Sequence, residues 1–218
     1  MMITDISKAR YNMIEQQIKP WNVFDVRVLS ALETVPREQF MPSAYQDMAL
    51  MDMNIPLPSG SHTFTPKEEA RIAQALEIQA TDTVLHIGAG CGYLTALLAE
   101  LSQQVHAVEL HEANHALASE NLAKLTNVTL EKGCGLVCAQ NKQYDVIVCT
   151  ASVDQCPEQF FEGLNDQGRL FIVEGNAPDM KATVIHKHPV RGIQQQQILF
   201  ETQCDRLNNL VPKSTFSL

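Results

Sequence analysis

One stretch, VLHIGAGCGY at residues 84–93, decides the fold of this 218-residue chain. A run of apolar residues typical of a buried strand leads directly into three glycines, and the leucine-rich segment 94–98 then begins a helix pattern. Glycine lets a backbone turn tightly and lie close to a ligand, and open parallel sheets bind ligands above their strand ends. The stretch therefore predicts a nucleotide-type binding site at Gly88, Gly90 and Gly92.

An acidic residue strengthens this prediction. Glu109 lies 21 residues beyond Gly88, at the end of the next apolar run, where a carboxylate can accept hydrogen bonds from both hydroxyls of a ribose. In a dinucleotide-binding turn the third glycine would stand at position 93, but Tyr93 is there and the spacing is Gly-x-Gly-x-Gly. This disfavours a nicotinamide enzyme. The alternative to a cofactor site is a tight turn beside a surface glutamate.

The rest of the chain predicts an α/β domain behind an N-terminal helical extension. Short β-branched runs alternate with helical patterns, which is typical of a parallel sheet; the runs are 83–87, 105–109, 128–130, 144–149 and 169–173. Two further runs, 182–186 and 197–202, are separated by too few residues for a crossover helix and should pair antiparallel. We expect a single domain 1–218, with 1–80 as the extension and 81–218 as the core.

Local signals place helices within the extension. An amphipathic stripe ends at Pro20, and Asp25 is a plausible N-cap for a second helix. Thr65-Pro66-Lys67-Glu68 has the capping-box pattern and predicts a helix from about 66 to 77. Residues 42–60 show little periodicity and read as an irregular surface segment of the kind that often contacts substrate.

Composition excludes several classes of function. With 16 basic and 25 acidic side chains the net charge is −9, which disfavours a nucleic-acid partner. We expect neither a signal peptide nor a membrane span, because no stretch approaches the roughly 18 apolar residues that a spanning helix needs. Six cysteines without a Cys-x-x-Cys pair indicate reduced thiols and a cytoplasmic location. His111 and His115 lack an evident third ligand, so we predict no metal site.

The glycine spacing resembles motif I of the S-adenosylmethionine-dependent methyltransferases. From about residue 10 to 175 the chain resembles the protein-L-isoaspartate O-methyltransferase family. The matching segments are VPREQFMP at 35–42, IPL at 55–57, GYLTA at 92–96, YDVIV at 144–148 and LNDQGRL at 164–170. The resemblance implies a Rossmann-like methyltransferase fold with a mostly parallel twisted sheet, S-adenosyl-L-methionine as cofactor, and methyl transfer to an isoaspartyl carboxylate in a damaged protein. The expected partner is thus an isoaspartyl protein or peptide, and we expect a monomer or weak oligomer.

The resemblance also implies roles for cofactor-binding residues beside the three glycines. Glu109 and the adjacent Leu110 would contact the nucleoside. His86 stands where the family usually has an acidic residue that helps to hold the methionine ammonium, and a cationic histidine would repel that group. Cys134 stands where the family commonly has an aspartate that accepts from the adenine amine, and a thiol is a weak acceptor. We therefore expect weaker cofactor binding than in a typical member.

For the acceptor side, Thr65 matches a family serine near the methyl-transfer site, with Thr63 behind it. Thr65 has a structural alternative, because the capping box already gives its hydroxyl a partner. The transfer itself requires no acid/base pair, since a carboxylate is already a nucleophile near neutral pH and positioning is the main demand. Two alternative functions remain: a methyltransferase with a different acceptor, and a catalytically silent paralogue that binds a partner.

Overall fold

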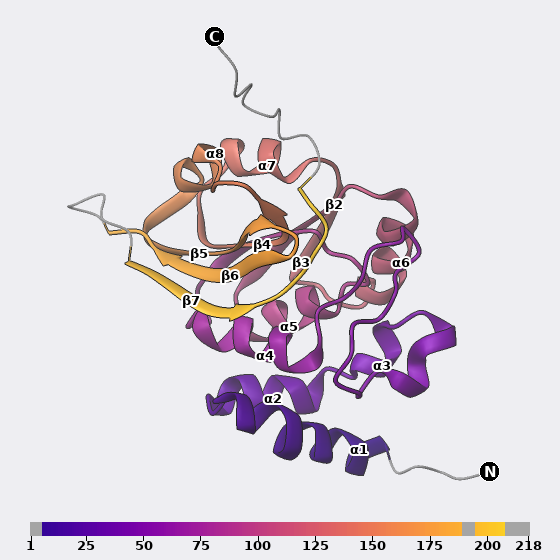
Figure 1. Cartoon of the computed structure of the whole chain (residues 1–218). Coiled ribbons are helices and arrows are strands. Elements are labelled where there is room, and N and C mark those ends of the chain that lie inside the picture. Colours follow the sequence, from indigo (N-terminus) through magenta and orange to yellow (C-terminus); the bar gives the residue numbers. More distant parts are fainter. Residues whose placement is uncertain (1–5, 189–194, 208–218) are drawn as a thin grey trace.

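The computed structural model describes residues 6–188 and 195–207. A single seven-stranded sheet has the order β3-β2-β1-β4-β5-β6-β7, with helices on both faces (Figure 1). Its strands are β1 Thr83–Ile87, β2 Gln104–Glu109, β3 Val128–Lys132, β4 Tyr144–Val153, β5 Leu164–Asn176, β6 Asp179–His186 and β7 Gln195–Glu201. Strands β1 to β5 pair in parallel, whereas β6 pairs antiparallel with β5 and β7. The predicted α/β architecture, a mostly parallel sheet with an antiparallel C-terminal strand pair, is confirmed.

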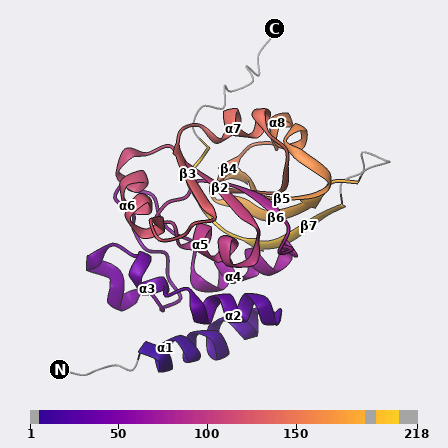
Figure 2. The same cartoon turned by 180° about the vertical axis from the view of Figure 1, so that it is seen from behind.

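Helices form three layers around the sheet. They are α1 Ile6–Met13, α2 Val26–Thr34, α3 Arg37–Phe40, α4 Pro66–Ala75, α5 Tyr93–Leu101, α6 Glu112–Leu122, α7 Gly135–Asn141 and α8 Glu158–Glu162. α4 and α5 cover one face and α7 and α8 the other, while α1 and α2 lie outside α4 and α5 (Figures 1 and 2). Among the described residues, no helix has the length and apolar character that crossing a membrane requires.

Two sequence predictions for the extension need correction. The first amphipathic stripe is not one α-helix, because α1 continues as a π turn, η1 Ile14–Ile18, and a 3-10 turn, η2 Lys19–Trp21, which contains Pro20. Proline lacks an N–H and is tolerated at the start of such a turn. The segment 42–60 is not wholly irregular either, since it begins with a 3-10 helix, η3 Ser43–Met48. The N-cap at Asp25 is confirmed, because its side chain accepts from the Arg27 amide.

Strand lengths also differ from prediction at the sheet's centre. β4 continues past residue 149, because Ser152 pairs with Val173 of β5 after a register shift. β5 begins at Leu164, before a local irregularity at Gln167, whose φ is 65°. The connection 189–194 between β6 and β7 lies outside the described residues. These extra pairings depend on the neighbouring strand, which local sequence patterns do not contain.

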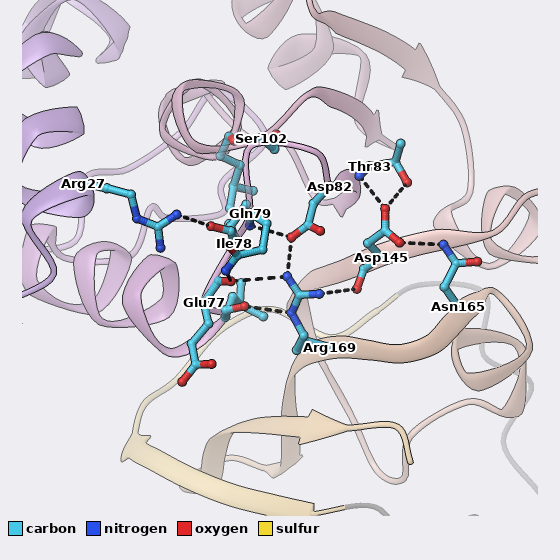
Figure 3. Close-up of polar contacts among 12 residues, drawn as sticks. Arg27, Glu77, Ile78, Gln79, Asp82, Thr83, Ser102, Asp145, Asn165 and Arg169 are labelled. Carbon is cyan, nitrogen blue, oxygen red and sulfur yellow. Dashed lines mark hydrogen bonds and ion pairs between the residues drawn. The ribbon is translucent and has the colours of Figure 1, made fainter. Parts of the chain in front are cut away.

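A polar network at the amino ends of the strands ties the extension to the sheet (Figure 3). The Arg169 guanidinium of β5 donates to the carbonyls of Leu76 and Glu77 after α4, and it pairs with the carboxylate of Asp82 before β1. It also donates to the Asp145 carbonyl of β4 at 3.5 Å. One cation thus connects the end of α4 to three segments of the core.

The Asp145 side chain is a second node of this network. It accepts from the Thr83 amide at 2.8 Å, the Thr83 hydroxyl at 2.9 Å and the Asn165 amide at 2.7 Å. Partial burial alone would raise the pKa of Asp145, but these hydrogen bonds and the nearby Arg169 charge hold it below its usual value. The carboxylate therefore stabilises the fold above the unfolded pKa, and this contribution is lost as the pH falls through the lowered pKa.

We predict that Asp145→Asn lowers the free energy of unfolding by about 1–2 kcal/mol near neutral pH, and that the loss shrinks towards pH 3. Urea unfolding followed by circular dichroism across this pH range measures both quantities. Asp166→Asn, at an exposed position of the neighbouring strand β5, is the matched control and should change little. A loss that is constant with pH would contradict this role for the Asp145 charge.

Candidate active site

A cleft of about 740 Å³ opens above the carboxyl ends of β1, β2 and β4. It is lined by the glycine turn, by the ends of β2 and β4, by residues after β3 and β7, by α6 and by the loop before α4. These residues are 57, 61–62, 87–88, 90, 108–111, 114, 133–135, 150–151 and 204–207. Parallel sheets bind ligands at this edge, where the strand order reverses between β1 and β4. The structure therefore gathers the predicted Gly88, Gly90, Glu109, Leu110 and Cys134 around one cleft.

The glycine turn is shaped by its backbone and by one side chain from a neighbouring strand. Gly88, Gly90 and Gly92 have φ values of +90°, +59° and +88°, which side-chain-bearing residues rarely adopt. The Thr150 hydroxyl donates to the carbonyls of Ile87 and Gly88, and a Cβ on Gly88 would lie 2.5 Å from it. The predicted Gly92 lines neither this cleft nor the smaller one next to it, and it is instead the N-cap of α5. Sequence reasoning missed Thr150, whose only signal is its place at the end of a predicted strand.

Glu109 joins the end of β2 to the turn. One carboxylate oxygen accepts from the Gly90 amide and the other from the His111 amide, both at 2.8 Å. The side chain is buried yet lines the cleft, and each oxygen keeps a second lone pair for a ligand hydroxyl. Leu110 and Cys134 border the same cleft. Glu109 is thus a structural clamp on the glycine turn as well as a candidate ribose ligand.

His86 does not lie where a contact with the methionine end of the cofactor, its predicted role, would require. It is 1% exposed, does not line the cleft, and its Nδ1 lies 2.8 Å from the Thr95 hydroxyl of α5. Burial lowers the pKa of His86 to about 3, so the imidazole is neutral at physiological pH. The expected repulsion of a ligand ammonium by a histidine cation is therefore absent, because side chains alternate along β1 and this one points to the helix.

A smaller cleft of about 450 Å³ adjoins the first. The two share several lining residues: Leu57, His62, Gly88, Gly90, Thr150 and Cys204. Thr63 lines the smaller cleft, whereas Thr65 lines neither. The Thr65 hydroxyl caps α4 by accepting from the Glu68 amide, and the Glu68 carboxylate accepts from the Thr65 amide. The predicted capping box is confirmed, and it is the role that the structure gives to Thr65.

The chain matches the family model described as protein-L-isoaspartate(D-aspartate) O-methyltransferase over residues 8–206. It belongs to this family. It is 33% identical over 199 residues to a protein-L-isoaspartate O-methyltransferase of Koribacter versatilis, covering 90% of this chain and 89% of that one. It is 36% identical over 171 residues to the Methanoculleus marisnigri enzyme, covering 77% and 78%. The resemblance recognised in the sequence is confirmed.

Solved structures agree on the fold. A Plasmodium falciparum protein-L-isoaspartate O-methyltransferase homologue, crystallised with S-adenosyl-L-homocysteine, superposes with a TM-score of 0.75 at 17% identity, over 92% of this chain and 97% of that one. Another protein-L-isoaspartate O-methyltransferase gives a TM-score of 0.74 at 23% identity, over 92% of this chain and 65% of that one. At such identities the agreement concerns the fold of the chain, including its N-terminal extension.

In this protein-L-isoaspartate O-methyltransferase family member, Arg37 of the VPR segment holds the smaller cleft together. The completely buried guanidinium donates to Glu69 at 2.9 Å, to the Phe64 carbonyl at 2.8 Å and to the Thr63 hydroxyl at 3.2 Å, and also to the Ala49 carbonyl. It lies 5.3 Å from the centre of the Tyr93 ring. Arg37 therefore joins the extension, α4 and the first residue of α5.

Glu69 is the single acidic partner of Arg37 among the described residues, and it lines the smaller cleft. Burial raises the pKa of Glu69, although the Arg37 charge opposes the shift. The sequence showed VPR as a motif but did not show its partner, which lies 32 positions away. The role of Arg37 was thus accessible only from the structure.

The segment after β7 closes the clefts of this methyltransferase fold from the other side. The Ser152 amide donates to the Asp205 carbonyl, and the Leu207 amide donates to the Ser152 carbonyl, both at 2.8 Å. The Thr202 hydroxyl donates to Glu68 of α4 at 2.9 Å. Cys204 borders both clefts. No pattern in the sequence indicated that residues 202–207 belong to the site.

We predict that Arg37→Met lowers the free energy of unfolding by about 3–5 kcal/mol, because it leaves the Glu69 carboxyl buried without its cation. The double variant Arg37→Met/Glu69→Leu should be more stable than the single variant, since no unpaired charge remains. Urea unfolding of both proteins measures the difference. Lys19→Met, which removes a third-exposed cation paired with Glu15, is the control and should cost under about 1 kcal/mol. Equal losses in the single and double variants would contradict the assignment.

Proposed function

We propose that this chain binds S-adenosyl-L-methionine in the larger cleft and transfers its methyl group to the carboxylate of an isoaspartyl residue presented at the smaller cleft. The observation that carries the proposal is the continuity of the two clefts at Gly88, Gly90 and Thr150. A donor lying along the glycine turn can therefore face an acceptor that enters from the side of Thr63. In-line positioning of this kind is the main requirement of the reaction.

The residues around the larger cleft fit this cofactor. Glu109 supplies a carboxylate for the ribose hydroxyls, and the absence of side chains at Gly88 and Gly90 leaves room for the rest of the molecule. S-adenosyl-L-methionine supplies a methyl group already activated by its sulfonium. The chain's own task is to hold the two reactants in line and to exclude water.

At the acceptor side we assign Thr63 as a positioning residue. Its hydroxyl oxygen accepts from the Ile55 amide at 3.0 Å and from Arg37, which fixes the wall of the smaller cleft. The catalytic role first considered for Thr65 is not part of the proposal, because its hydroxyl caps α4 outside both clefts. Leu57 and His62, at the end of the extension's loop, line both clefts and would face the bound peptide.

The proposal also covers the cellular location, the partner and the domain organisation of the protein. All six cysteines are free thiols, which suits a reducing cytoplasm, and an isoaspartyl protein or peptide would be the partner. We also infer one domain, because α2 and α4 of the extension pack on α5 of the core.

The first experiment is a calorimetric titration of the protein with S-adenosyl-L-homocysteine, the demethylated product. Micromolar binding would support the cofactor site, and methylation of an isoaspartyl peptide but not of its aspartyl isomer would then support the acceptor. Transfer only to a small molecule would favour a methyltransferase with another acceptor. Absence of binding up to millimolar product, with an unshifted melting temperature, would overturn the proposal in favour of a silent paralogue.

We predict that Glu109→Gln weakens binding of S-adenosyl-L-homocysteine by about tenfold or more, because a neutral amide is a poorer partner for ribose hydroxyls and for the Gly90 amide. The same titration measures the effect. Glu120→Gln, an exposed position on α6, is the control and should bind as the parent does. An unchanged affinity in Glu109→Gln would remove the ribose contact from the proposal.

We also predict that Cys134→Asp strengthens product binding by about tenfold, since a carboxylate is a much better acceptor for the adenine amine than a thiol. Cys156→Asp, in the loop before α8, tests whether added charge alone has this effect and should not strengthen binding. If Cys134→Asp leaves the affinity unchanged, the adenine amine does not lie at this position.

A further inference from the structure

Three different metal-ligating side chains meet outside the clefts, on the face of the sheet that α7 covers. His106 of β2, Glu131 of β3 and Cys138 of α7 each place a ligand atom within 4.8 Å of the other two. In the parallel pairing His106 lies opposite Thr129, two residues before Glu131, so both side chains point to the same face. α7 packs on β1 and β2 and brings the Cys138 thiol to this face.

Tyr144 orients the imidazole of this cluster. Its hydroxyl lies 2.7 Å from Nδ1 of His106, while Nε2 lies 3.0 Å from a carboxylate oxygen of Glu131. A bare ring nitrogen and a carboxylate repel each other at that separation, so a proton or a metal ion must lie between them. When Nδ1 carries the hydrogen and donates to the Tyr144 oxygen, the Nε2 lone pair is available for a metal. A hydrogen bond to the second ring nitrogen is the usual support of a metal-bound histidine.

We propose that His106, Glu131 and Cys138 form a binding site for a Zn²⁺ ion, with water as the fourth ligand. Zn²⁺ accepts thiolate, imidazole and carboxylate ligands together, whereas Mg²⁺ requires oxygen ligands. Tetrahedral coordination keeps ligand atoms roughly 3.3–3.8 Å apart, so the three side chains, now within 4.8 Å of one another, would draw closer around the ion, and the half-exposed Glu131 side chain has room to rotate. On binding, the Cys138 thiol releases its proton to solvent, and the imidazole keeps its one hydrogen on Nδ1.

This site would anchor α7 to β2 and β3. Cys138 lies one helical turn beyond Cys134, the residue before α7 that borders the larger cleft. The bound ion would therefore hold in place the helix that follows one wall of the cleft. The proposal does not depend on methyl transfer, because it concerns residues outside both clefts.

The test is titration of the untagged, metal-free full chain with ZnCl₂ by calorimetry, with MgCl₂ in parallel. We expect one Zn²⁺ per chain at micromolar concentration or below, a raised melting temperature and no response to Mg²⁺. Co²⁺ in place of Zn²⁺ should give a thiolate-to-metal charge-transfer band. Glu131→Gln and Cys138→Ser should each weaken Zn²⁺ binding by about tenfold or more, and Cys138→Ser should also abolish the band.

Two controls keep the result decisive. Cys156→Ser removes a half-buried thiol outside the cluster and should leave Zn²⁺ binding and the Co²⁺ band unchanged. Because Cys138 is buried, Cys138→Ser can lower the stability of the protein, and circular dichroism of the metal-free proteins checks their folding. If Cys138→Ser does not fold, the result for Glu131→Gln, at an exposed position, decides the test. Absence of binding at micromolar Zn²⁺, or binding that both cluster variants leave intact, would overturn the proposal.

Discussion

The buried ion pair between Arg37 and Glu69 is the constraint on which the architecture around the clefts depends. An unpaired charge in this position would cost several kcal/mol, so the loop carbonyls of Ala49 and Phe64 and the Thr63 hydroxyl must converge on the guanidinium. Five donors in a fixed planar arrangement allow one arginine to join these separate segments, which the single ammonium of a lysine cannot do. The extension is thereby locked to the edge of the sheet where the clefts open.

Backbone geometry is a second constraint on the edge of the sheet where the clefts open. Three glycines with positive φ shape the turn after β1, and groups from the neighbouring strands hold it. Thr150 of β4 binds its carbonyls, and Glu109 of β2 binds one of its amides. Because β2 and β4 flank β1, the turn is fixed from both sides before any ligand arrives. Such preorganisation suits a reaction that depends on positioning.

The two departures from the family pattern have different physical meanings. His86 is buried against Thr95 and neutral, so its substitution for an acidic residue places no positive charge near the cleft. Cys134 borders the cleft, so its substitution changes a group that a ligand would meet. The same loop leads into α7, whose Cys138 joins His106 and Glu131 on the opposite face of the sheet from α4. The segment after β3 therefore contains both Cys134, which lines the cleft, and Cys138, one member of the metal-ligating cluster.

Local patterns in the sequence determined the alternation of strands and helices, the glycine turn and the caps of α2 and α4, because each depends on residues a few positions apart. Glu109 was found from its place at the end of the next predicted strand. Features that depend on contacts between residues far apart in the sequence were visible only in the tertiary structure. The partner of Arg37 lies 32 positions away, and Thr202 reaches Glu68 across 134 positions. The neutral state of His86, the support from Thr150, the closure of the clefts by residues 202–207 and the extra length of β4 and β5 are all of this kind. Burial, charge pairing and strand register are properties of the folded neighbourhood, so no local spacing contains them.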